Sequence, residues 1–212
     1  MLTPYMIGAD VRCTDGACGQ VSRVVIAPAT MTVTHLVVDP KDRKQLGRLV
    51  PLDLVDTTPG GISLRCTTAE LYQLTHAEKT QFVPGSGAYA RHGPGQSAKP
   101  HWAQVQSRPD GVPGRRPQTF TYDVPPAGEV AVRGGDPVYA IDGDIGHITG
   151  VAMDAGSRQV AYVLLHARHL LGRKNITIPS STVTRVDAGI QLNITRRDIK
   201  HLPPVNLQQP DG

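Results

Sequence analysis

The feature that most constrains this chain is an internal repeat. Two segments, Val11 to Leu74 and Val138 to Leu202, carry matching residues at a spacing of 127, which becomes 128 after one extra residue in the second copy. A repeat of this length indicates a tandem duplication, so the chain is expected to fold as two similar units. The matched positions are Asp15-Gly16 with Asp142-Gly143, Gly19 with Gly146, Val24 with Val151, Pro51 with Pro179, Val55 with Val183, Gly61-Ile62 with Gly189-Ile190, Leu64 with Leu192, and Thr67 with Thr195.

Each copy has the pattern of short β-strands separated by turns. In the second copy, Ile148–Met153 and Val160–Leu165 flank a polar turn, and Val183–Val186 and Ile190–Ile194 flank another, which predicts two hairpins. Ile176–Ile178 alternates as a half-buried strand does and ends at a proline. The corresponding strands expected in the first copy are Gly19–Ile26, Val33–Val38, Arg48–Pro51 and Ile62–Cys66. Because about 70 residues cannot build two stacked sheets, we expect each copy to close into a small barrel without open edges.

A short helix is predicted at the end of each copy. Thr67 with Glu70, and Thr195 with Asp198, have the capping-box spacing, in which a threonine hydroxyl and an acid satisfy each other's backbone N–H groups. We therefore expect one helical turn after the last strand of each copy.

The interval between the copies has a different composition. Residues 76–131 contain 7 Gly and 8 Pro and no periodic apolar pattern, which favours a disordered linker. Five of the nine aromatic residues of the chain also lie there, among them Trp102, the only tryptophan. Either these aromatics rest on the barrels, or the linker carries short recognition motifs that order on binding. The predicted domains are a barrel at 1–75, the linker at 76–131, a barrel at 132–203 and a flexible tail at 204–212.

The repeats resemble the PRC-barrel family. In the second copy the resemblance rests on Asp142-Gly143 and Gly146, the sequence HLLGRK at 169–174, ITIP at 176–179 and DAGIQLNIT at 187–195. The first copy keeps the same order in Asp15-Gly16, Gly19, Leu46-Gly47-Arg48, Val50-Pro51 and Gly60-Gly61-Ile62, so the resemblance covers roughly two-thirds of the chain.

This resemblance implies an all-β chain of two tandem small barrels, each of about six strands. The family includes the cytoplasmic domain of photosynthetic reaction-centre H subunits and the C-terminal domain of ribosome-maturation factors of the RimM type. In these proteins the barrel serves docking and assembly, and the family shares no catalytic residues. This chain has no apolar run long enough to span a bilayer and little room for the maturation factor's other domain, so neither role is inherited directly.

Motifs for catalysis are lacking, and two groups of candidate metal ligands are incomplete. The sequence has no G-x-S-x-G motif and no complete phosphate-binding loop. Cys13, Cys18 and Cys66 align with apolar residues of the second copy, which favours core packing. His166 and His169 have a metal-ligand spacing without a third ligand, so a solvated loop is the favoured interpretation and a metal the alternative. We expect that the chain is not an enzyme and that it has no catalytic, cofactor-binding or metal-binding residues.

Basic residues are the remaining candidates for a binding site. The net charge of +4 divides as 0 for residues 1–75, +2 for 76–131 and +2 for 132–212, less than the excess typical of nucleic-acid-binding domains. Equivalent loops of the two copies are either ordinary solvated loops or a repeated contact for an anionic partner. The candidate residues are Lys41, Arg43, Lys44, Arg48, Arg168, Arg173 and Lys174.

Together these observations predict a non-enzymatic adaptor for protein partners, without a cofactor and without membrane insertion. The alternatives are an RNA- or ribosome-associated protein that binds through the basic loops, and a peripheral component of a membrane-associated complex of the photosynthetic type. The odd number of cysteines and the absence of a secretory signal favour a cytoplasmic location. The two barrels act either as separate modules on a linker, which raises avidity, or as an intramolecular pair.

Overall fold

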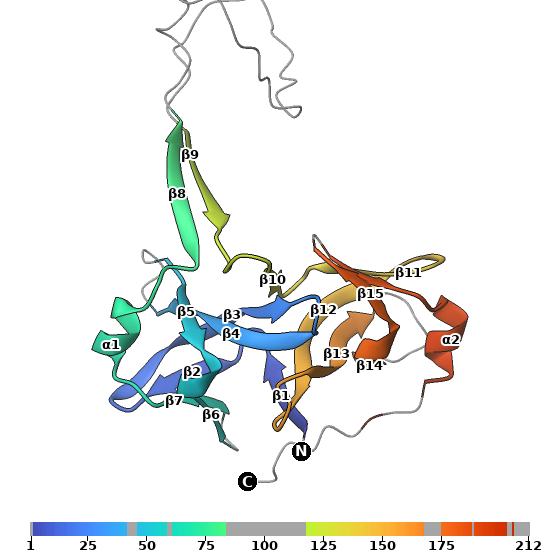
Figure 1. Ribbon diagram of the computed structural model, residues 1–212, viewed down its shortest axis with the longest axis horizontal. Coiled ribbons are helices and arrows are strands. Elements are labelled where there is room, and N and C mark those ends of the chain that lie inside the picture. The colour runs from blue at the N-terminus through green and yellow to red at the C-terminus, as the bar shows by residue number, and fades with distance from the viewer. Residues whose placement is uncertain are drawn as a thin grey trace, which may run out of the picture. The chain divides into compact units, whose positions relative to one another are not determined.

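The computed structural model describes residues 2–41, 46–58, 61–83, 118–167, 175–187, 189–202 and 205. The chain is mostly β, with two curled seven-stranded sheets and a separate two-stranded sheet, which confirms the all-β class (Figure 1). The chain divides into two compact units. One unit, residues 1–78 and 123–212, contains both repeats, and the other is residues 79–122.

The repeats have the same order of elements. The first repeat contains β1 (Leu2–Met6), β2 (Asp10–Cys13), β3 (Gly16–Ala27), β4 (Thr32–Pro40), β5 (Arg48–Pro51), the 3₁₀ turn η1 (Leu52–Leu54), β6 (Val55–Thr58), β7 (Gly61–Leu64) and α1 (Thr68–Gln73). The second contains β10 (Val130–Arg133), β11 (Pro137–Ala140), β12 (Gly143–Asp154), β13 (Val160–Ala167), β14 (Asn175–Pro179), η2 (Ser180–Thr182), β15 (Val183–Val186), β16 (Ile190–Leu192) and α2 (Arg196–Lys200). Between them lie β8 (Glu78–Val83) and β9 (Gln118–Asp123).

Strand pairing confirms the hairpins that the sequence predicts. The first sheet runs β5-β4-β3-β2-β7-β6 and the second β14-β13-β12-β11-β16-β15. The pairing of the described residues forms an open path in each sheet, not the complete ring expected from the sequence. Pro51 and Pro179 end β5 and β14, since proline cannot donate a ladder hydrogen bond, and the 3₁₀ turns then lead to β6 and β15.

The first strand of each repeat pairs with the sheet of the other repeat. β1 pairs antiparallel with β12, and β10 pairs antiparallel with β3 (Figure 1). The two registers are equivalent, because Tyr5 faces Val151 and Val132 faces Val24. The two repeats therefore exchange a strand, as the subunits of a swapped dimer do.

The exchange is followed by matching turns. Gly8 and Gly135, at equivalent positions, have φ values of 92° and 93°. The Gly8 N–H donates to the Val21 carbonyl and the Gly135 N–H to the Ile148 carbonyl, so that each chain segment returns to its own repeat after the exchanged strand. Glycine adopts this left-handed conformation at no steric cost, which explains its use at both crossovers.

The tips of two equivalent hairpins also meet. The Val33 N–H donates to the Arg158 carbonyl at 2.9 Å, and the Val160 N–H donates to the Met31 carbonyl at 2.7 Å. Met31 and Arg158 are equivalent residues, and both have positive φ. These reciprocal contacts are what an approximate two-fold axis between the repeats requires, so the intramolecular pairing left open by the sequence is present.

One hydrophobic core runs through both repeats. Buried side chains from both sheets and from both helices form a single cluster, which includes Tyr5, Leu36, Leu71, Ile148 and Ile199. The predicted helix caps are confirmed: Thr67 with Glu70 and Thr195 with Asp198 form complete capping boxes. Because each exchanged strand contributes a core residue to the other sheet, neither repeat completes its core alone.

Residues repeated in the sequence have equivalent structural tasks. The carboxylates of Asp15 and Asp142 accept from the first backbone N–H groups of α1 and α2 at 3.0 and 2.9 Å. A Cβ at Gly19 or Gly146 would stand 2.2 Å from a backbone oxygen of the adjacent strand. These residues are therefore repeated because they cap a helix or allow two strands to approach.

The interval 76–131 differs from its prediction as a linker. Its described parts contain β8, β9 and β10, and residues 75–77 lie along the edge of β5, where the Leu49 N–H donates to the Thr75 carbonyl. These strands were not predicted because β8 and β9 lie outside the repeat and the sequence of β10 differs from that of β1. Residues 84–117 and most of 204–212 lie outside the described residues. Over the described ranges, no helix is long and apolar enough to cross a membrane.

Candidate functional site

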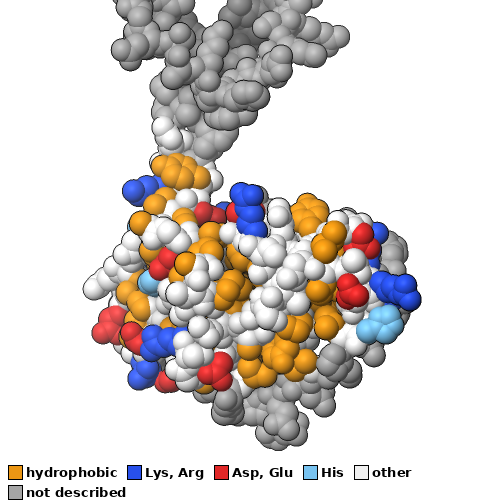
Figure 2. Space-filling view, turned by 45° about the vertical axis from the view of Figure 1, so that its right-hand side comes forward, with side chains coloured by type: hydrophobic (Ala, Val, Ile, Leu, Met, Phe, Trp, Pro, Cys, Tyr) orange, Lys and Arg blue, Asp and Glu red, His pale blue; other side chains and the backbone are white. Residues whose placement is uncertain are grey.

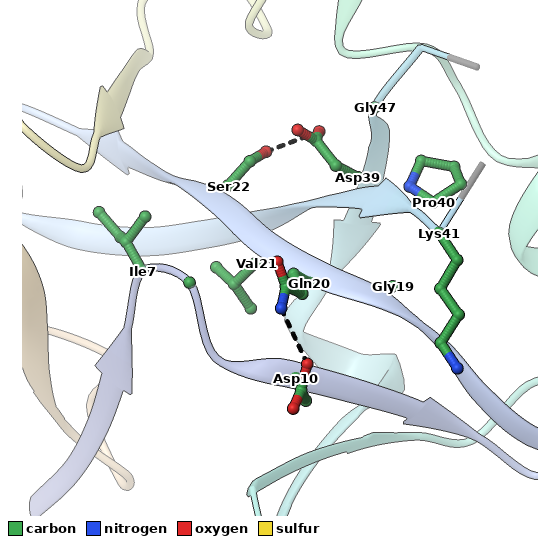
Figure 3. Close-up of a pocket in the computed structure, with 11 residues that line it drawn as sticks. Ile7, Asp10, Gly19, Gln20, Val21, Ser22, Asp39, Pro40, Lys41 and Gly47 are labelled. Carbon is green, nitrogen blue, oxygen red and sulfur yellow. Dashed lines mark hydrogen bonds between the residues drawn. The ribbon is translucent and has the colours of Figure 1, made fainter. Parts of the chain in front are cut away.

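A groove of about 670 Å³ lies on the first repeat (Figure 3). Its wall is formed by the first half of β3 and the end of β4, with the turn after β1 at one end and Lys41 at the other. The lining residues are Ile7, Gly8, Asp10, Gly19, Gln20, Val21, Ser22, Asp39, Pro40, Lys41 and Gly47. The groove owes its form to Gly19 and Gly47, since a Cβ at either position would collide with atoms of β4.

The polar side chains of the groove are held in two pairs. Ser22 Oγ donates to Asp39 Oδ1 at 2.7 Å, and Gln20 Nε2 donates to Asp10 Oδ1 at 3.0 Å (Figure 3). Ser22 reaches Asp39 because a bulge lies between Val21 and Arg23 in the pairing of β3 with β4. The groove therefore offers fixed acceptors in Asp10 and Asp39 and a cationic donor in Lys41.

A buried arginine lies behind this wall. Arg23 is 6% exposed, its guanidinium pairs with Glu78, its Nε lies 3.3 Å from Asp123 Oδ1, and its Nη1 lies 3.9 Å from Asp39 Oδ1. Arg133 of the exchanged strand β10 donates from Nε to Asp123 at 2.9 Å, and this hydrogen bond raises the pKa of its guanidinium. The carboxylates compensate two arginines that face each other in the β3–β10 pairing.

The second repeat has no such network at the equivalent position. Gly150 replaces Arg23, and a Cβ there would stand 2.4 Å from the Tyr5 carbonyl oxygen of β1. The exchanged strand thus packs tightly on β12 through glycine, whereas on β3 it is held by charge pairs. The interruption of an apolar strand by Arg23 was the signal in the sequence that could have revealed this network.

The predicted basic contacts have divided outcomes. Lys41 is exposed at the groove. Arg48 is buried, its Nη1 donates to the Leu74 carbonyl at 3.1 Å and lies 3.0 Å from His76 Nε2, so its charge serves the interior and not a partner. The other five predicted residues, Arg43, Lys44, Arg168, Arg173 and Lys174, lie outside the described residues.

Part of the charge on the described surface is held in ion pairs. Over the face in Figure 2, basic and acidic side chains are interspersed. Examples from the ion pairs are Arg65 with Asp56 at 3.4 Å and Arg185 with Asp187 at 2.5 Å.

The three cysteines are buried in the core of the first repeat, as expected for Cys66. Burial raises the pKa of Cys13 to about 12 and that of Cys66 to about 11, so these thiols stay protonated at neutral pH and are poor nucleophiles. Cys18 Sγ donates to the Val11 carbonyl at 3.5 Å. The structure therefore assigns them to packing.

His169, the partner of His166 in the alternative of a metal site, lies outside the described residues. His166 faces His147 across the β12–β13 pairing, with ring centroids 5.4 Å apart. Sequence reasoning missed His147 because the contact depends on the strand register. Their equivalents in the first repeat are Gln20 and Asp39, which are cross-strand neighbours in the groove.

The groove contains the groups of a binding site. Its hydroxyl, Ser22, donates to a carboxylate and has no histidine partner among the interactions of the described residues. Fixed carboxylates, an amide and a lysine are suited to hold the polar groups of a partner. Comparison of the chain with known protein families and with curated proteins finds no match.

Proposed function

We propose that this chain is a non-enzymatic assembly adaptor of the PRC-barrel type, which binds a protein partner in the groove of its first repeat. The observation that carries the proposal is the groove itself, a polar recess whose acceptors are fixed by Ser22 and Gln20. In concave binding sites a few precisely placed polar groups fix the orientation of the bound group, and here they would hold side chains of the protein partner.

The exchange of strands supports an adaptor with fixed geometry. Because β1 and β10 join the two sheets, the faces of the two repeats are held at a constant separation within one compact unit. A rigid body of this kind can bridge two partners without the entropy loss of a flexible tether. This replaces the flexible bivalent mechanism as the favoured arrangement.

The two faces also differ in chemistry. Gln20 and Asp39 stand in the first repeat where the second has His147 and His166. A duplicated protein that bound the same partner twice would need the same groups at both places, so the difference favours two unlike partners. The RNA-binding alternative is less supported, because Arg48 is buried and basic and acidic side chains are interspersed over the face in Figure 2.

Affinity capture from a lysate of the source organism at low salt tests this function. The groove is filled by Gln20→Tyr, an exposed strand position at which tyrosine is well tolerated, and Gln191→Tyr, at the exposed position of β16, is the matched control. We expect a protein that survives nuclease treatment, is retained by the wild type and by Gln191→Tyr, and is lost with Gln20→Tyr. Equal capture by all three chains would contradict the groove's role, and capture that disappears with nuclease would establish the RNA-binding alternative.

A further inference from the structure

We propose that His147 and His166 form a binding site for a divalent transition-metal ion of the zinc, nickel or copper type. This site lies on the second repeat, apart from the groove, and is independent of the proposed adaptor function. Imidazole is the protein ligand that these ions share, and the pair has no adjoining carboxylate that would favour magnesium or calcium.

The separation of the two rings fits one shared ion. A zinc–nitrogen bond is about 2.0–2.1 Å and a ring nitrogen lies about 1.1 Å from its ring centre, so two imidazoles on one tetrahedral ion have centres about 5.2 Å apart. The observed centroid separation is 5.4 Å, with the ring planes tilted by 36°. The two rings are therefore at the separation that one shared metal ion requires.

The backbone holds the pair in place. His147 and His166 are direct cross-strand neighbours on β12 and β13, next to Gly146, which allows β12 to approach the backbone of His166. Side chains at directly opposed positions of an antiparallel pair are the closest pairs that a sheet provides. The two ligands thus come from rigid strands and not from a loop.

A neighbouring amide fixes the orientation of one ligand. His166 Nδ1 lies 3.4 Å from Asn175 Oδ1, an oxygen that only accepts, so this contact favours the neutral tautomer with the proton on Nδ1. In that tautomer the lone pair of Nε2 is available for a metal. Metal-binding histidines regularly use their other ring nitrogen in this way, which sets the tautomer and increases ligand basicity.

Within the described part of the chain, the pair supplies only two of the ligands that such an ion needs. Over the described residues, no group of three or more His, Cys, Asp or Glu side chains is gathered to hold a metal. Two positions of a tetrahedral ion would remain for water or for a side chain of a partner. The first repeat lacks this site, because Gln20 and Asp39 occupy the equivalent positions.

The test uses the full chain without an affinity tag, freed of metal with a chelator, and titrated with Zn²⁺ by calorimetry. The variants are His147→Gln, which introduces the residue type of the first repeat, and His166→Gln, with the exposed His201→Gln as the matched control. We expect a saturable site in the wild type, at least tenfold weaker affinity in each of the first two variants, and a change of less than twofold in the control. Thermal unfolding of every variant verifies that the chain remains folded.

Copper provides an independent measurement. Cu²⁺ bound to the wild type should give an electron paramagnetic resonance spectrum with coupling to two nitrogens, reduced to one or none in either variant. The proposal is overturned by the absence of saturable Zn²⁺ binding, by unchanged affinity in both variants, or by loss of binding in only one of them.

Discussion

The two repeats share a fold but differ in the side chains at equivalent positions of their strands. At equivalent positions the first repeat has Arg23 and the second has Gly150, so one exchanged strand is held by buried charge and the other by close backbone packing. On the neighbouring face, Gln20 with Asp39 contrasts with His147 with His166. The duplicated residues cap a helix, form a turn or pack a strand contact, whereas the residues that differ line the two proposed sites. The positions that differ between the two repeats are therefore the ones to test for function.

The largest expected effect comes from separating the repeats. A chain of residues 1–78 lacks the strand that β10 supplies, and a chain of residues 123–212 lacks β1. We predict that neither half is a folded monomer, and that the two halves co-expressed assemble into a one-to-one complex, measured by light scattering and circular dichroism. A stable, folded monomer of either half would contradict the conclusion that each repeat needs the strand supplied by the other.

Replacing the buried arginine should have the next largest effect. Arg23→Met leaves Glu78 without its cation, while Asp123 keeps Arg133, and loss of one member of a buried ion pair costs about 3–5 kcal/mol in the free energy of unfolding. The double variant Arg23→Met/Glu78→Gln should be less destabilised than the two single variants together, because one uncompensated charge is removed. Denaturant unfolding measures both, and simple additivity would show that the pair is not coupled.

Gly19 and Gly146 lie at equivalent close approaches of two strands but differ in backbone conformation. A Cβ at Gly19 or Gly146 would stand 2.2 Å from a backbone oxygen, but only Gly146, at φ 146°, also has a backbone conformation unfavourable for other residues. We expect Gly19→Ala to cost about 1–3 kcal/mol by overpacking. Gly146→Ala should cost about 1 kcal/mol more because backbone strain is added. Equal losses of stability in the two variants would contradict this account.

The helix caps predict a smaller effect of acid. Hydrogen bonds from Thr67 lower the pKa of Glu70, those from Thr68 lower that of Asp15, and those from Thr195 lower that of Asp198. Since the folded pKa values lie below the unfolded ones, this stabilisation is present above about pH 5 and is lost as the pH falls through the folded values. Unfolding free energies measured between pH 7 and pH 3 should decrease, and less so in Asp15→Asn/Asp198→Asn.

Much of the fold could be predicted from the sequence, because each local pattern occurs twice, once in each repeat. The capping boxes at Thr67 and Thr195 and the hairpin of β12 with β13 were predicted where the structure has them. The exchanged strands β1 and β10 were not predicted. Their sequences differ, and pairing with either sheet satisfies the same register and burial, so local pattern alone cannot decide between them.

The candidate sites were less accessible to sequence reasoning. The groove depends on a bulge that turns Ser22 toward Asp39, and the histidine pair depends on the register that sets His147 against His166. Both are long-range consequences of pairing. The basic loops were predicted as contacts because the charge of a residue can be read from the sequence. The burial of Arg48 and its contacts with Leu74 and His76 cannot be read in this way.

The strand exchange is tested most directly by a pair of engineered disulfides. Pro4 faces Ala152 in the β1–β12 pairing, and the equivalent residue in the chain's own repeat is Val25. Cα atoms of directly opposed antiparallel residues are about 4.5–5.5 Å apart, within the range that a disulfide spans. The account predicts that Pro4→Cys/Ala152→Cys cross-links within one chain under mild oxidation and that Pro4→Cys/Val25→Cys does not, as read by peptide mass spectrometry. Cross-linking of the second pair and not of the first would show that β1 belongs to its own repeat and would contradict the account.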